Sequence, residues 1–409
     1  MNTRRCFYIP LSVSVASLLL FSTARASTND REYRMGDDGA ESASNGGSVG
    51  TTFDSQGQLD MSQLHDLVSS GSPVYRTISG RPDGGSGLGI ELNGSSQYLR
   101  SARLGEPGTT ASALGGDFGG TLNYTGLTNR GFQFWVQPAG TGAQTLVMDT
   151  NQHGARINAS GNFSMRYADT DFDSTQAVVA STWYHVMVVR PNGANDGARM
   201  YVDGVAVATA AGGYDGADTA DLVVGANTAG DDGGDGGAGF SGGTEEFFGG
   251  IIDDLTMFVV GESTEFAGPP SAAGVDFGEF DFATDNAFAA FTLSGVPGDV
   301  DNDGDLDQLD KNDFIAGWMR DNLVNDIRVP DLKSYAAGDL DFDGITDIID
   351  LVLIQAALPL AGLRTIAAAE LNGIAATVCL SVGPSRCARR SAVSSLKRVI
   401  AQKMLSLDL

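Results

Sequence analysis

Residues 183–190 read WYHVMVVR and residues 200–207 read MYVDGVAV, and these two segments indicate the fold of most of the chain. Both are rich in the β-branched and aromatic residues that favour strands. Asp203-Gly204 interrupts the second segment, and this dipeptide favours the primed turn that connects two antiparallel strands. The second segment is therefore predicted to be a β-hairpin, and the first to be a strand beside it.

The same signals continue upstream and downstream. Residues 131–138 form a strand with two distinct faces, one made by Phe132, Phe134 and Val136 and the other by Gln133, Trp135 and Gln137. Glycine-rich turns separate further short strands, among them Leu222–Val224 and Ile251–Val260. No convincing amphipathic helix precedes Asp310. Many short strands without helices predict a mainly β fold, a sandwich or jelly roll.

Several segments resemble a laminin G-like domain of the concanavalin A-like lectin/glucanase class. They are LNGSSQYL (92–99), GFQFWVQP (131–138), GARINASGNFSMRYAD (154–169), STWYHVMVVR (181–190), MYVDGVAVA (200–208) and FFGGIIDDLTMF (247–258). The resemblance covers residues 32–261. It implies a two-sheet jelly-roll sandwich that binds glycans or proteins, in some members with its own calcium ion.

Residues 299–310 (DVDNDGDLDQLD) have the spacing of a calcium-binding loop. Asp299, Asp301 and Asp303 occupy positions 1, 3 and 5, Asp305 position 7, Asp307 position 9 and Asp310 position 12. The pattern recurs forty residues later in Asp339, Asp341, Asp343, Ile345, Asp347 and Asp350. Positions 7 offer backbone carbonyls, and the aspartates offer the hard oxygen ligands that Ca²⁺ prefers. Without a cation these carboxylates would repel one another, so calcium is favoured over two solvated acidic loops.

Residues 298–358 resemble a duplicated type I dockerin, because each loop precedes an apolar helical segment and no helix enters it. The resemblance implies a small α-helical, EF-hand-like calcium module on the C-terminal side that docks onto a cohesin on another protein. Two features depart from the family. Loop positions 10 and 11 are Gln308-Leu309 and Ile348-Ile349 instead of a Ser-Thr-like pair, and the repeats are further apart than usual.

The ends of the chain differ from its body. Residues 1–26 read as a secretory signal peptide, with Arg4 and Arg5, an apolar run and a small-residue cleavage site. The segment 262–297 is interpreted as a linker, and the basic tail 359–409 as disordered. No cysteine lies between Ser27 and Leu360, so no disulfide framework is expected there. A net charge of −26 disfavours nucleic acid and anionic membranes as partners.

Catalytic signals are weak. The Glu-x-Asp-x-x-Glu pattern of glucanase relatives is missing, and Glu245-Glu246 has the wrong spacing for that mechanism. The three histidines are too far apart in sequence to suggest a zinc site. Asp253 and Asp254 could form a rim calcium site or a solvated strand end. Trp135, Trp183 and His185 fit a strand core better than a sugar platform or a catalytic base.

The sequence thus predicts an exported, non-catalytic binding protein whose cofactor is calcium. Its jelly roll would bind a polysaccharide or glycoprotein, and its dockerin-like module a cohesin-like protein. No nucleic-acid partner and no membrane span in the mature chain are expected. Two alternatives stay open: a polysaccharide hydrolase of the glucanase-like class, and a surface adhesin stiffened by calcium.

Overall fold

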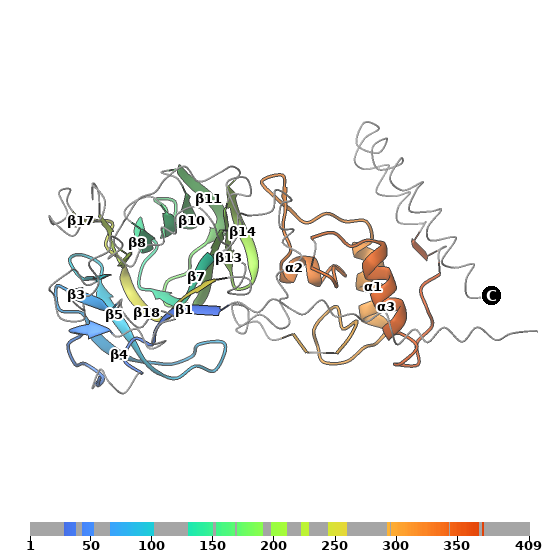
Figure 1. The fold of residues 1–409 in the computed structure, drawn as a ribbon, viewed down its shortest axis with the longest axis horizontal. Helices are drawn as coiled ribbons and strands as arrows, with labels where there is room; N and C mark the ends of the chain where they lie inside the picture. The colour runs from blue at the N-terminus through green and yellow to red at the C-terminus, as the bar shows by residue number, and fades with distance from the viewer. Residues whose placement is uncertain are drawn as a thin grey trace, which may run out of the picture.

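The computed structural model describes residues 28–37, 43–52, 66–101, 130–149, 153–167, 170–190, 198–210, 222–228, 244–259, 293–294, 296–342, 344–367 and 370–371. They form a β domain (28–259) and, beside it, a helical module (296–371) (Figure 1). The predicted signal peptide, most of the predicted linker, Asp343 and residues 372–409 lie outside the described residues. None of the helices in the described part of the chain has the length and apolar character that crossing a membrane requires.

The β domain consists of two antiparallel sheets of eight strands each. Sheet A has the order β14 (Val205–Ala210), β13 (Ala198–Val202), β12 (Tyr184–Arg190), β7 (Arg130–Pro138), β18 (Gly249–Val259), β5 (Gly87–Asn93) and β4 (Val74–Ile78), and β1 (Thr28–Tyr33) pairs with the second half of β18. Sheet B has the order β11 (Thr170–Ala177), β10 (Asn162–Tyr167), β9 (His153–Ile157), β8 (Gln144–Asp149), β15 (Leu222–Val224), β6 (Tyr98–Ser101), β3 (Leu67–Ser70) and β2 (Thr51–Thr52). A short ladder joins β16 (Asn227–Thr228) to β17 (Thr244–Glu245). This architecture confirms the predicted mainly β sandwich and fits a jelly roll.

The alternation in β7 places the core as predicted. Phe132, Phe134 and Val136 are buried between the sheets, where they meet apolar side chains of sheet B such as Phe163. The predicted hairpin is β13–β14, and Asp203 and Gly204 have φ values of 50° and 74°. These left-handed values are those of the primed turn that matches the twist of a hairpin.

The outer face of sheet A is apolar as well. Trp135 and Trp183 pack there with Ile78, each tryptophan is 5% exposed, and Trp183 donates from Nε1 to the carbonyl of Ser79 at 3.0 Å. The structural interpretation of these tryptophans is therefore confirmed. A second outer group, from β12 to β14, contains Met187, Val189, Tyr201 and Ala206, and the helical module covers it.

The helical module contains α1 (Gln308–Gly317), β19 (Leu323–Val324), β20 (Ile327–Arg328), α2 (Leu332–Tyr335) and α3 (Ile348–Ala357). Its small core joins Val300, Phe314, Ile354 and Leu358, and it includes Ile366 and Leu371. The Lys311 Nζ atom lies 3.1 Å from Glu370 Oε1, and Gln355 donates to the carbonyl of Ile366 at 2.7 Å. The first part of the segment expected as a disordered tail therefore packs against the helices, up to residue 371.

His185 lies inside this fold as an uncharged ring. It is 3% exposed on β12, and its ring meets Trp135 edge-on with centroids 5.1 Å apart. Burial lowers the pKa of His185 to about 3, and the nearby charge of Asp83 opposes this shift only in part. The unfolded chain takes up a proton below its ordinary pKa of 6.5, and the folded chain does not.

We therefore expect His185 to make the β domain sensitive to mild acid. As pH falls from about 6.5 to about 4.5, His185 should cost roughly 2–3 kcal/mol of free energy of unfolding. His185→Gln should remove this part of the pH dependence, measured as urea unfolding midpoints across that range. Between about pH 7 and 8 the difference between variant and wild type should stay constant. Parallel curves from pH 7 to 4.5 would contradict the assignment.

Candidate functional site

The two predicted calcium loops have the same hydrogen-bonding scheme at position 12. In the first loop, Asp310 Oδ1 accepts from the amides of Val300 (2.6 Å) and Asp301 (3.2 Å), and Oδ2 accepts from Asp307 (2.7 Å). In the second loop, Asp350 accepts in the same way from three amides, those of Leu340 (2.6 Å), Asp341 (3.1 Å) and Asp347 (2.6 Å). Each loop is therefore closed around a buried carboxylate before any cation is considered.

Position 1 is equally fixed. Asp299 and Asp339 are both 0% exposed, and Oδ2 of each accepts from the amide of the glycine at position 6 at 2.9 Å. Those glycines, Gly304 and Gly344, have φ values of 102° and 82°. A residue with a β-carbon rarely adopts such values, which is the physical reason for glycine at this position.

Position 9 begins the helix that follows each loop. Asp307 and Asp347 are the N-caps of α1 and α3 and accept from the amides of Leu309 and Ile349. The position 12 aspartate returns the bond to the cap, which completes a capping box in both repeats. The acidic residues therefore explain where the helices start.

The geometry of the carboxylates fits a divalent cation. Oxygens of Asp299, Asp301 and Asp303 lie within 4.8 Å of one another, as do those of Asp305, Asp307 and Asp310, and in the second loop those of Asp339, Asp341 and Asp350. Two oxygens that share Ca²⁺ at about 2.3–2.6 Å can be at most about 5 Å apart. The structure thus brings together nine of the predicted ligands. Ile345 at position 7 is bridged to Asp321, Asp347 caps α3, and Asp343 lies outside the described residues.

The charges in both loops oppose one another. Burial, followed by the charge of Asp341, raises the pKa of Asp350 to about 8. The pKa of Asp301 is raised by desolvation and by Asp310, and the pKa of Asp305 by Asp303. These shifts express the repulsion expected from the sequence, which a bound cation would relieve.

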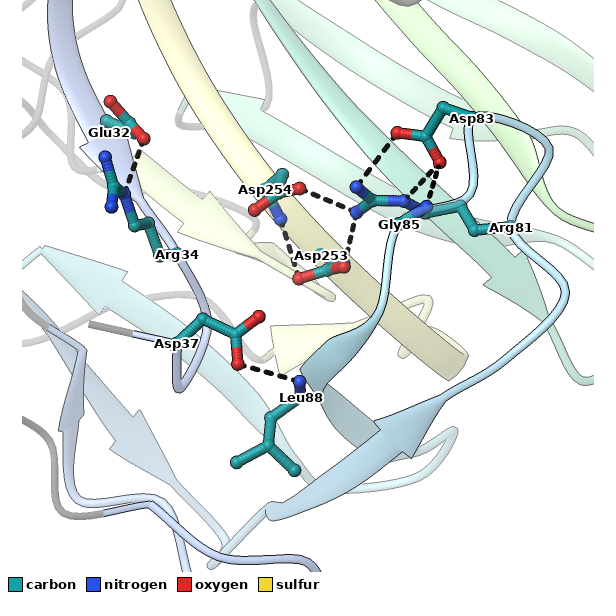
Figure 2. Close-up of polar contacts among 9 residues, drawn as sticks. All are labelled: Glu32, Arg34, Asp37, Arg81, Asp83, Gly85, Leu88, Asp253 and Asp254. Atoms are coloured by element: carbon teal, nitrogen blue, oxygen red, sulfur yellow. Dashed lines mark hydrogen bonds and ion pairs between the residues drawn. The ribbon is translucent and has the colours of Figure 1, made fainter. Parts of the chain in front are cut away.

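A second acidic cluster lies in the β domain, around Arg81 in the loop between β4 and β5 (Figure 2). Arg81 Nη1 lies 2.6 Å from Asp253 Oδ2 and 2.6 Å from Asp254 Oδ2 on β18, and Arg81 also makes two contacts with Asp83, at 2.8 and 2.9 Å. The side chain of Arg81 is 8% exposed and that of Asp253 is 1% exposed. The guanidinium carbon is 5.3 Å from the centroid of Trp135, so the cluster fixes the loop over the outer face of sheet A.

This cluster corrects the alternatives considered for Asp253 and Asp254. Asp253 is buried rather than a solvated strand end, and both carboxylates share the cation that Arg81 supplies. Burial is the main cause that raises the pKa of Asp253 and of Asp254, and Arg81 counteracts it. Sequence reasoning missed Arg81, which is 172 residues from Asp253 and carries no local signal.

Glu246 is also ion-paired. Its Oε1 lies 2.6 Å from Arg156 Nη2, and Arg156 Nη1 lies 2.7 Å from Asp171 Oδ2. The two carboxylates therefore flank one guanidinium on sheet B.

These sheets and clusters belong to a recognisable fold. Residues 121–259 match the family model of the concanavalin A-like lectin/glucanases superfamily. The match confirms the predicted resemblance over the part of the concanavalin A-like domain from β7 to β18. The resemblance of residues 298–358 to a dockerin stays a prediction.

Solved structures with a similar fold are distant in sequence. Domain 4 of an extracellular arabinanase from Geobacillus stearothermophilus, solved with arabinotriose, is 15% identical, with 58% of this chain and 95% of that chain covered and a TM-score of 0.35. The botulinum neurotoxin serotype D binding domain is 12% identical, with 60% and 51% covered and a TM-score of 0.34. This chain thus spans about half the length of that binding domain. A pentraxin from Limulus polyphemus is 16% identical, with 33% and 67% covered and a TM-score of 0.23. No curated protein matches the chain.

We expect the Arg81 cluster to be essential for the stability of the concanavalin A-like domain. Arg81→Met should lower the free energy of unfolding by roughly 3–5 kcal/mol, because it leaves buried Asp253 without a cation. The matched control is Arg76→Met, since Arg76 pairs with Glu91 where both side chains are more than a third exposed. That change should cost at most about 1 kcal/mol. Equal losses in the two variants, measured by urea unfolding, would contradict this role of Arg81.

Proposed function

We propose that the chain is an exported, non-catalytic binding protein that holds two calcium ions in its helical module. The observation that carries the proposal is the repeated loop geometry, in which positions 1 and 12 are buried and amide-bound in the same way twice. Such repetition is hard to explain for two solvated acidic turns. Export is proposed from residues 1–26, whose charge and apolar run are typical of a signal peptide.

In this proposal the first ion is held by Asp299, Asp301, Asp303 and Asp310, with Asp305 and Asp307 completing the site. The second is held by Asp339, Asp341 and Asp350, with Asp343, the carbonyl of Ile345 and Asp347 completing it. When bound, calcium supplies positive charge that offsets the repulsion within each loop. Its binding energy therefore stabilises the folded module.

The concanavalin A-like domain is proposed to bind a neutral polysaccharide or a glycoprotein. The described carboxylates examined as catalytic candidates, Asp253 and Glu246, are each held by an arginine. A general acid and a nucleophile on a glycoside must instead face the substrate from two sides. The overall charge of −26 suits a neutral ligand better than an anionic one.

The helical module is proposed to attach the chain to a cohesin-like protein. Leu309 and Ile349, at position 11 of the two loops, are 55% and 52% exposed. Large apolar side chains exposed at equivalent positions of both repeats are suited to a protein partner.

Calcium binding is tested by titration calorimetry on the chain from Ser27 to Leu409. We expect two equivalents, with dissociation constants of roughly 10⁻³ M or tighter. Asp301→Ala and Asp341→Ala, at position 3 of the two loops, should each remove one equivalent. Mg²⁺ should bind much more weakly, because it requires a smaller, octahedral site. A wild-type chain without calcium-specific heat would refute the proposal.

The non-catalytic role is tested on a panel of neutral β-glucans and arabinans with calcium present. We expect retention on at least one polysaccharide and no release of reducing ends above buffer. Turnover that disappears in Asp254→Asn, but not in the exposed-site variant Glu245→Gln, would establish the hydrolase alternative instead. A chain with neither retention nor turnover on glycans would leave glycoproteins as the ligand class.

A further inference from the structure

The extra length between the two loops forms the contact with the β domain. Residues 323–328 make the hairpin β19–β20, whose turn residues Asn325 and Asp326 have φ values of 49° and 63°. Thr209 on β14 donates from Oγ1 to the carbonyl of Val324 at 2.9 Å. Strand β14 is the edge of sheet A, so the hairpin covers an edge that would otherwise be open to pairing.

The N-cap of α2 extends this contact. Asp331 is 1% exposed, and its Oδ1 accepts from the amide of Ser334 at 2.7 Å. Its Oδ2 accepts from the amide of Ala206 on β14 at 3.0 Å, and the amide of Leu332 donates to the carbonyl of Gly204 at 3.1 Å. One carboxylate thus joins the helix start to the β domain. Figure 1 shows α2 on the side of the module that faces β13 and β14.

The second calcium loop belongs to the same interface. Ser334 donates from Oγ to Asp339 Oδ2 at 2.6 Å, which is the position 1 oxygen that also accepts from Gly344. Phe342, at position 4, stacks on Tyr335 with ring centroids 5.1 Å apart and 14° between the planes. Both rings pack in the apolar cluster that contains Met187 and Tyr201 of the β domain.

The first loop has none of these contacts among the described residues. Its position 4 is Asn302, which is exposed and accepts from the amide of Ser294. A β-carbon on Gly304 would meet no described atom within 4 Å, whereas one on Gly344 would lie 3.1 Å from the carbonyl carbon of Val329. The two loops share their internal geometry and differ in what surrounds them.

From this asymmetry we propose that calcium in the second loop controls the docking of the helical module on the outer face of sheet A. The inference rests on the proposed calcium role and adds which of the two ions regulates the interface. Phe342 has a φ of 55°, an uncommon value for an aromatic residue, which the closed loop imposes. When the ion leaves, the carboxylates of this loop repel, and both Phe342 and the Asp339–Ser334 bond lose their fixed geometry.

Amide hydrogen exchange on the chain from Ser27 to Leu409 tests the proposal. With calcium, the peptide covering β14 should be protected, because the Ala206 amide donates to Asp331. Chelator should accelerate its exchange about ten-fold or more, the range of ordinary coupling energies. Asp341→Ala should give fast exchange even with calcium, and the matched variant Asp301→Ala should not. The peptide covering β7 reports whether the β domain stays folded and should not change.

Coupling must act in both directions. Ala206→Arg places a bulky cation in the interface and should weaken calcium binding at the second loop by about ten-fold, measured in an Asp301→Ala background. The control Val179→Arg adds the same charge where the side chain is 59% exposed, and should leave that affinity unchanged.

The possible failures are distinguishable. If calorimetry shows that Asp341→Ala loses one calcium equivalent while β14 keeps its protection, the regulatory inference is wrong and the calcium role stands. If both position 3 variants release β14 equally, the asymmetry between the loops is wrong. If neither loop binds calcium, the proposed function fails and the inference fails with it.

Discussion

Burial of carboxylates is the constraint on which this structure depends. Asp253, Asp299, Asp310, Asp331, Asp339 and Asp350 are all at most 1% exposed. An ionised carboxylate in such a place is strongly destabilising unless hydrogen bonds or a cation compensate it. The β domain supplies Arg81, and the module supplies backbone amides, three of them to each position 12 aspartate. Amides satisfy the oxygens without neutralising the charge, so the module retains an excess of negative charge that the β domain does not have around Asp253.

The helical module is small, and its core alone gives it little stability. Phe314, Ile354 and Leu358 form the centre, and the chain after α3 returns to add Ile366 and Leu371. Modules of this size usually need a disulfide, a metal or a partner surface. The first is missing because no cysteine lies between Ser27 and Leu360. The contact with sheet A and the acidic loops are the two remaining means, and the second loop takes part in both.

Much of this could be predicted where the determining residues are close together in sequence. The period of two in β7, the Asp-Gly turn of β13–β14 and the loop spacing each act within about a dozen residues, so their signals are local. The pairing of Arg81 with Asp253 and the contact of Asp331 with Ala206 join residues 172 and 125 positions apart. Neither leaves a periodic pattern, because one arginine or aspartate in a turn looks like an ordinary solvated residue. The packing of residues 363–371 was missed for a related reason, since their composition is dominated by alanine and basic side chains.

One signal for the interface was nevertheless present in β12. Residues 186–189 read VMVV, a continuous apolar run, whereas an antiparallel strand with one solvated face alternates apolar and polar residues. Val186 and Val188 face the core of the sandwich, and Met187 and Val189 face the module. Both faces of this strand are therefore covered, one by sheet B and the other by α2 and the second calcium loop. The outer face of sheet A is built as an interior surface, so the module is part of the fold of the β domain and not an independent appendage.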